Sequence, residues 1–174
     1  MKLRGVSQEV DQIQTDALVL SFFQDERPLK GTAGMSDWHM CGRLSKLIMA
    51  RFVDGKFGEP LLMPAARRMA CQKILLIGLG PTAKFDFDLY RSIVNQACDA
   101  LRKLQVTHFA LPLPGIGLSS VDAGEAAEYL GKILPSKFGP DQRVLENLDV
   151  MVIADRNQLK SIAPVLARLE RTYR

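Results

Sequence analysis

The residues best suited to bind a ligand lie in a glycine loop that connects a predicted strand to a predicted helix. The segment LPLPGIGLSS precedes the alanine-rich stretch AGEAAEYLGKIL. Glycine lets a backbone approach a ligand closely, and free amides at a helix N-terminus favour an anion. The sequence therefore predicts an anion site built mostly from backbone amides, unless the loop is only a tight turn. The candidate residues are Gly115, Ile116, Gly117, Leu118, Ser119 and Ser120, with Ser119 or Ser120 as the helix cap.

The other possible sites each lack a partner that their chemistry requires. Residues 78–80, Gly-Leu-Gly, follow a strand as in a dinucleotide-binding loop, but the third glycine is missing and Pro81 follows at once. His39 and Cys41 are two residues apart on a predicted helix, so they point in different directions and do not share a metal. We therefore predict no catalytic residue, no metal ligand and no cofactor.

Four apolar runs define the sheet that must position the glycine loop. Because these runs are apolar without strict alternation, they are typical of strands covered on both faces. They are expected at residues 17–23, 73–79, 108–113 and 148–154, with a short edge strand in KLRGV. Helical segments alternate with them, which predicts a three-layer α/β/α fold with a mixed, mainly parallel sheet. No linker or repeat interrupts the sequence, so residues 1–174 are expected to form a single domain.

Local signals predict the connecting elements. Ser36 is expected to cap one long helix with a single buried stripe, and Asp86 stands at the start of the next helix. A small β-hairpin is expected around Asp54-Gly55. The stripe consists of Trp38, Cys41, Leu44, Leu47 and Ile48.

Composition is that of an ordinary globular protein. Apolar residues make up 47% of the 174 residues and charged residues 24%, which argues against disorder and against a disulfide scaffold. The formal net charge of +4 is too small to indicate nucleic-acid binding without clustered charge. Three cysteines without metal spacing suggest reduced thiols.

No apolar run is long enough for a signal peptide or a membrane span, so we expect a cytoplasmic protein and no membrane partner.

The order of these segments resembles the N-terminal domain of the leucine aminopeptidase (cytosol aminopeptidase) family. The matching pieces are TDALVLSFF, GMSDWHMCGRLSKLI, DGKFGEPLLM followed by KILLIGLG, and FDFDLYRSIVNQACDAL. The resemblance implies a non-catalytic domain, because in that family the two metals and the catalytic lysine belong to a C-terminal domain. The motif of that catalytic domain, Asn-Thr-Asp-Ala-Glu-Gly-Arg, does not occur in this sequence.

A second resemblance is to the macro domain, some of whose members bind ADP-ribose. SQEVDQIQTDALVL is similar to the opening of a macro domain, and this register implies that Glu9 takes the place of an aspartate that holds the adenine amine. LPLPGIGLSS is similar to the macro phosphate loop. However, LSFF replaces the macro Asn-Ala-Ala-Asn, so Phe23 stands in place of the ribose-contacting asparagine. Phe22 or Phe23 could therefore fill the cleft.

Four functions remain open from the sequence. The first is a non-catalytic domain that acts in association or regulation, through self-association or a peptidase partner. The second is a macro-like module that binds a nucleotide, ADP-ribose or another anion at residues 115–120. The third is a weak DNA-binding domain, and the fourth is a fragment of a full metalloaminopeptidase.

Overall fold

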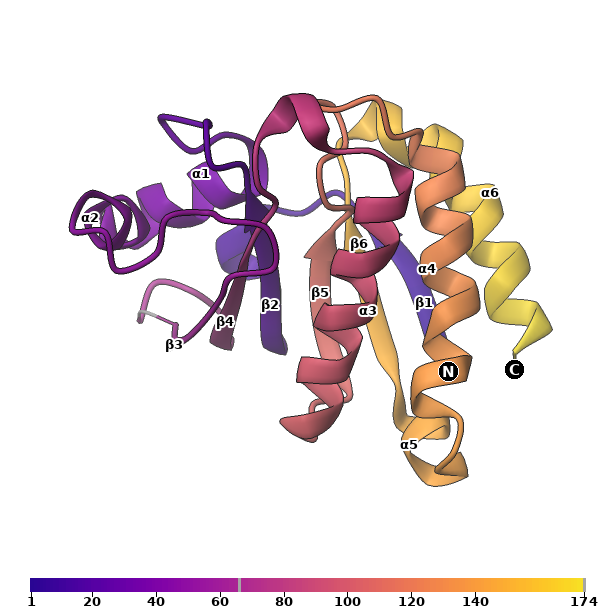
Figure 1. Cartoon of the computed structure of the whole chain (residues 1–174). Helices are drawn as coiled ribbons and strands as arrows, with labels where there is room; N and C mark the ends of the chain where they lie inside the picture. Colours follow the sequence, from indigo (N-terminus) through magenta and orange to yellow (C-terminus); the bar gives the residue numbers. More distant parts are fainter. Residues whose placement is uncertain (66, 174) are drawn as a thin grey trace.

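A computed structural model describes residues 1–65 and 67–173, which form one six-stranded sheet between two layers of helices (Figure 1). The strand order is β1-β6-β5-β2-β4-β3, and all neighbours are parallel except the antiparallel pair β3 and β4. This architecture confirms the predicted three-layer fold with a mixed, mainly parallel sheet. The strands are β1 (Lys2–Val6), β2 (Thr15–Phe22), β3 (Pro60–Pro64), β4 (Cys71–Gly78), β5 (His108–Pro112) and β6 (Asp149–Ile153).

The helices divide between the two faces of the sheet. Figure 1 shows α3, α4 and α6 side by side on one face, whereas α1 and α2 lie beyond the other. The short helix α5 connects α4 to β6. The helices are α1 (Gly31–His39), α2 (Arg43–Met49), α3 (Phe87–Lys103), α4 (Ala123–Phe138), α5 (Gln142–Asn147) and α6 (Arg156–Thr172), with 3-10 turns η1 (Val10–Gln12) and η2 (Thr82–Lys84).

Alternation along the central strands explains why both faces are buried. In β2, Val19 packs toward α3 and α4, while Leu18 and Leu20 pack toward α1 and α2. Successive side chains of a strand point to opposite faces, so a doubly covered strand must be apolar throughout. The four predicted interior strands are confirmed in position, and the predicted edge strand is β1.

The first long helix predicted from the sequence is wrong, because two shorter helices occupy this segment. Cys41 has a positive φ of 56° and breaks the helix between α1 and α2. Ser36 is not a cap but lies inside α1, and Trp38 of the expected buried stripe is 72% exposed. The carboxylate of Asp37 instead accepts hydrogen bonds from the amides of Leu44 and Ser45 in the first turn of α2.

The hairpin predicted around Asp54-Gly55 is also wrong. The antiparallel pair is formed by β3 and β4, and residues 54–59 form a turn held by the Glu59 carboxylate. This turn packs against the end of β4, where a Cβ at Gly78 would lie 2.2 Å from the carbonyl oxygen of Lys56. Gly78 is therefore required by the close approach of two backbones, because a side chain there would clash with the turn.

The cap of α3 and the state of the three cysteines can also be compared with the sequence predictions. Asp86 accepts a hydrogen bond from the amide of Leu89 and caps α3, as predicted. The three cysteines are free, with Cys71 and Cys98 buried and Cys41 exposed. Within the described residues, no helix has both the length and the apolar character needed to cross a membrane. The cytoplasmic location stays a prediction.

Candidate functional site

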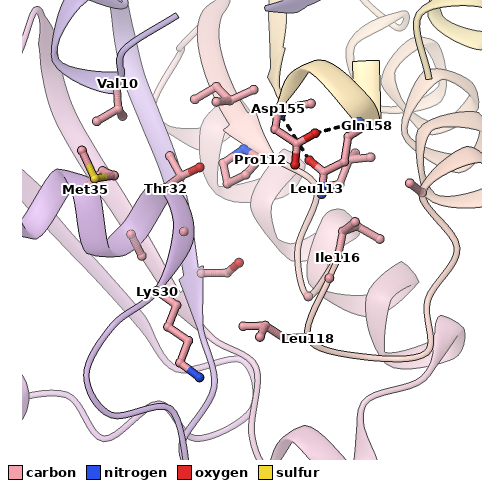
Figure 2. Close-up of a pocket in the computed structure, with 18 of the residues that line it drawn as sticks. Val10, Lys30, Thr32, Met35, Pro112, Leu113, Ile116, Leu118, Asp155 and Gln158 are labelled. Carbon is pink, nitrogen blue, oxygen red and sulfur yellow. Dashed lines mark hydrogen bonds between the residues drawn. The ribbon is translucent and has the colours of Figure 1, made fainter. Parts of the chain in front are cut away.

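A cavity of about 470 Å³ lies at the carboxyl ends of β2, β5 and β6 (Figure 2). The segments that follow these strands and β1 form its walls, together with the first turn of α1. In open α/β sheets this edge is where ligands usually bind, and the volume is within the range of small-molecule sites. The cavity is therefore the principal candidate site.

The structure brings most of the predicted site residues together. Glu9, which follows β1, lines the same cavity as Gly115, Ile116, Gly117 and Leu118, which follow β5. These positions are more than 100 residues apart in sequence, and the parallel order of the strands places them at one edge.

The two serines of the predicted site do not line this cavity. The hydroxyl of Ser119 donates a hydrogen bond to the carbonyl oxygen of Gly115, so it holds the loop together. Helix α4 begins at Ala123, and its cap is Asp122, whose carboxylate accepts from the amide of Glu125. The prediction that Ser119 or Ser120 caps the helix is therefore wrong, because the loop extends two residues further.

The two glycines of the loop have different surroundings. Both have positive φ, 74° at Gly115 and 84° at Gly117. A Cβ at Gly115 would lie 2.5 Å from Cε1 of Phe85, whereas a Cβ at Gly117 would meet no atom within 4 Å. Gly115 is thus required for packing, while Gly117 leaves an exposed stretch of backbone that a ligand can approach.

The two phenylalanines considered as fillers of the cleft lie on different faces. Phe22 packs on the α1–α2 side of the sheet. Phe23 does line the cavity, but its ring is 1% exposed and forms an edge-on contact with Phe85, with centroids 5.3 Å apart. Phe23 therefore forms a floor beneath the loop and leaves the cavity hollow.

Unpaired backbone amides from two segments belong to residues that line the cavity. In the loop, the amides of Ile116, Leu118 and Ser119 donate to carbonyl oxygens of the same segment. Among the described residues, no acceptor is found for the amides of Gly115 and Gly117, nor for those of residues 31–33 at the start of α1. Such amides are the groups that bind anions at helix N-termini and in glycine loops.

Among the described residues, the charged groups that line the cavity are the carboxylates of Glu9, Glu26 and Asp155 and the ammonium of Lys30. Both carboxylate oxygens of Glu26, which is buried, accept backbone amides, from Phe23 at 3.0 Å and Lys30 at 2.8 Å. Asp155 caps α6 by accepting from the amides of residues 157 and 158. The side chains of Glu9 and Lys30 are exposed and have no hydrogen-bond or ion-pair partner among the residues described.

Sequence reasoning missed Lys30, the first turn of α1 and Asp155. Because the helix was expected to start after Ser36, the amides of residues 31–33 were counted as loop. A recognisable signal was present for Asp155, since this polar residue directly follows the apolar run LDVMVIA. No group of three or more His, Cys, Asp or Glu side chains that could hold a metal is found in the described part of the chain.

Comparison with known proteins identifies the family. A sequence profile of the N-terminal domain of the cytosol aminopeptidase family matches residues 19–133. The chain belongs to this family.

Two curated relatives of this cytosol aminopeptidase domain are much longer than the chain. A probable cytosol aminopeptidase from Alkaliphilus oremlandii is 23% identical over 134 residues, covering 77% of this chain and 26% of the relative. One from Picosynechococcus is 26% identical over 164 residues, covering 90% of this chain and 33% of the relative. The chain thus spans between a quarter and a third of the length of these relatives.

Solved structures show that the domain has the macrodomain fold. A tomato leucine aminopeptidase mutant superposes with a TM-score of 0.69 at 18% identity, covering 99% of this chain and 35% of that chain. A macrodomain of Oceanobacillus iheyensis with MES bound gives 0.68 at 14% identity, covering 97% and 92%. Thermosipho africanus DarTG in complex with ADP-ribose gives 0.59 at 14% identity, covering 88% and 42%.

Proposed function

We propose that this cytosol aminopeptidase N-terminal domain acts by binding rather than by catalysis, and that its pocket holds a small molecule through an anionic group. The observation that carries the proposal is the set of unpaired amides from residues 31–33, Gly115 and Gly117 around one cavity. Amides that are fixed by the fold and lack a protein partner favour an acceptor with negative charge. Lys30 adds an ammonium group to the cavity lining.

Two structural neighbours give independent support to an anionic ligand. One neighbour is in complex with ADP-ribose and another has MES, a sulfonate, bound. The resemblance to the macro domain puts Phe23 in the place of the ribose-contacting asparagine, and in this structure Phe23 is packed against Phe85. We therefore propose an anion-binding pocket without an asparagine for a ribose, and an affinity in the millimolar to tens-of-micromolar range, since amides and one exposed lysine do most of the binding.

A thermal-shift titration with inorganic phosphate and with ADP-ribose tests this proposal. At a ligand concentration ten times a Kd of about 1 mM, binding adds about 1.4 kcal/mol, which corresponds to a Tm increase of about 3–6 °C for a domain of this size. Gly117→Leu should abolish the shift by covering the exposed backbone. Gly42→Leu is the matched control, because Gly42 also has positive φ and open space but does not line the cavity. No shift with any anion, or an equal shift in Gly117→Leu, would contradict the proposal.

Exposed apolar side chains favour a second function, association with another copy or with a peptidase partner. Trp38, Met49 and Phe52 are 72%, 79% and 68% exposed, and all three belong to the segment from α1 to the turn after α2. Large apolar side chains that are left exposed within one short segment are candidates for an interaction surface. We expect light scattering to show association of the chain that increases with its concentration. The double variant Met49→Ser with Phe52→Ser should remove this association, and the control variant Leu104→Ser should retain it. A monomer at all concentrations would contradict self-association.

A further inference from the structure

Helix α2 and the turn after it expose cations beside large apolar side chains. Arg43, Lys46, Met49, Arg51 and Phe52 are all exposed, and together they are called the α2 surface below. Residues 43–52 contain three basic residues and no acidic residue. Figure 1 shows α2 at the end of the molecule opposite α6, and the α2 surface does not line the anion pocket. The two regions can therefore act independently.

The three cations of the α2 surface form no ion pair within the described part of the chain. Arg43, Lys46 and Arg51 lie within 4 Å of no described carboxylate. On the helices of the other face, by contrast, cations of α4 and α6 pair with Glu128 and Asp99. The charges of the α2 surface are thus available to a partner.

The acidic residues beside α2 are engaged within the fold. Asp37 is buried, and its carboxylate accepts the first amides of α2. Glu59 accepts the amides of residues 54–56, and a carboxylate oxygen of Asp54 lies 3.7 Å from Nζ of Lys56. These carboxylates therefore do not neutralise the α2 surface.

Two of the cations occupy positions that the helix itself disfavours. Arg43 is the first residue of α2, where the helix dipole favours an anion. Arg51 follows the C-cap with a φ of 54°, a left-handed conformation in which glycine is the usual residue. Phe52 comes next and is 68% exposed, although a residue at this position commonly packs back on the helix. Residues kept at a local cost to the fold are typical of functional surfaces.

Two hollows adjoin α2 and provide room for apolar side chains of a partner. Met49 and Arg51 line one hollow. The exposed ring of Trp38 lines the other, together with Ser45 and Arg68. Each hollow thus combines a large apolar side chain with a guanidinium group.

We propose that the α2 surface docks an acidic segment of another protein, in which carboxylates stand beside apolar side chains. The carboxylates pair with Arg43, Lys46 and Arg51, and the apolar side chains cover Met49 and Phe52. Opposite charges on the two partners speed their encounter and fix the register of the contact. The inference rests on the proposed association surface, and it adds the chemistry of the partner.

Other occupants match the α2 surface less completely. A two-fold contact between copies uses the same surface twice, so it would place the cations against each other and leave apolar contact alone to favour it. A nucleic acid would match the cations but leave Met49 without an apolar partner. A bilayer would match charge and apolar character but would not fill two separate hollows.

Fluorescence anisotropy with a labelled peptide of repeated Glu-Glu-Leu-Leu units tests the inference. Two control peptides, with Gln in place of Glu or Ser in place of Leu, should each bind about tenfold more weakly or worse. Raising the ionic strength from about 0.01 M to about 1 M shortens the Debye length from about 30 Å to about 3 Å, and should weaken the acidic peptide about fivefold or more.

Two variants of the chain remove the cations. Arg43→Glu with Lys46→Glu should weaken the acidic peptide about tenfold or more. The control Lys84→Glu with Lys160→Glu makes the same change in net charge at exposed positions elsewhere, and should keep the affinity within about twofold. Arg51→Gly should weaken the peptide about two- to fivefold while keeping or raising the Tm, because glycine suits the positive φ. A purely structural role of Arg51 would leave binding unchanged.

Equal affinity for the acidic and the Gln peptide, or equal binding by the two double variants, would overturn the inference. Tighter binding of single-stranded DNA or of anionic vesicles than of the acidic peptide would overturn it as well. Self-association in light scattering without binding of the acidic peptide would overturn the inference alone and leave the association surface standing. Absence of both would remove the surface too. The thermal shift with phosphate should be unchanged in every α2 variant, since these residues lie outside the pocket.

Discussion

The two glycines of the 113–119 loop provide a quantitative test of the structure, because their surroundings differ while their backbone conformations agree. A residue other than glycine with φ near 74° or 84° costs roughly 1–2 kcal/mol at either position. At Gly115, a new Cβ would also lie 2.5 Å from Cε1 and 2.9 Å from Cδ1 of Phe85, and 3.3 Å from Cζ of Phe23. Overpacking of this kind adds about 1–3 kcal/mol.

Gly115→Ala should therefore lower the free energy of unfolding by roughly 2–5 kcal/mol, and Gly117→Ala by roughly 1–2 kcal/mol. Urea unfolding at a constant m-value measures both, and against a typical total of about 5–15 kcal/mol the difference is easily resolved. Phe85→Leu in the Gly115→Ala background should recover part of the loss, because it removes the ring edge. Equal destabilisation by the two alanines, or no recovery with Phe85→Leu, would refute the account of this loop.

Four further outcomes are expected. Burial raises the pKa of the Cys98 thiol to about 12 and also raises the pKa of the Cys71 thiol. The exposed Cys41 should therefore react rapidly with a disulfide reagent at pH 8, whereas Cys71 and Cys98 should react only on unfolding. Rapid reaction of all three thiols would contradict the burial of Cys71 and Cys98. Hydrogen bonds from Thr82 hold the pKa of Asp25 below its usual value, so the stability that Asp25 contributes should be complete above about pH 4 and lost as the pH falls through the lower folded value. Asp25→Asn should accordingly make the unfolding free energy depend less on pH below about pH 4, which urea titrations at several pH values would show. Tyr90→Phe should cost about 0.5–1.5 kcal/mol, because the buried hydroxyl donates to the carbonyl of Ala126 and links α3 to α4; a neutral effect in urea unfolding would contradict this link. The purified chain should not hydrolyse leucine anilides with added zinc or manganese, and activity that persists after removal of host peptidases would refute the non-catalytic proposal.

Hydrophobic patterning was sufficient to predict the four interior strands, since each doubly covered strand had to be apolar along its whole length. The cap of α3 was predictable for a similarly local reason, because Asp86 precedes an apolar helical repeat and uses its own first turn.

Features that depend on long-range packing were not predictable. The helix break at Cys41 leaves Trp38 exposed, and the α2 cap comes from Asp37, seven residues before Leu44. The turn at 54–59 has hairpin residues, but Gly78 of β4 holds it against the sheet and the next strand begins only at Pro60.

In the candidate site too, residues with a local sequence signal were predicted and residues placed by long-range packing were not. The glycine loop was identified from residue type and Glu9 from a family resemblance, and both line the cavity. Ser119 or Ser120 was expected to cap the helix because serine is a common capping residue, whereas Asp122 is the cap used. Lys30 and Asp155 could be assigned to the site only after the strand order placed β2 and β6 on either side of β5.

The most direct test of the binding account is an amide chemical-shift titration of the ¹⁵N-labelled domain with inorganic phosphate. The account predicts saturable shifts at Gly31, Thr32, Ala33 and Gly117. Unchanged amides at these positions at saturating ligand, or shifts confined to the α1–α2 surface around Trp38 and Phe52, would contradict it.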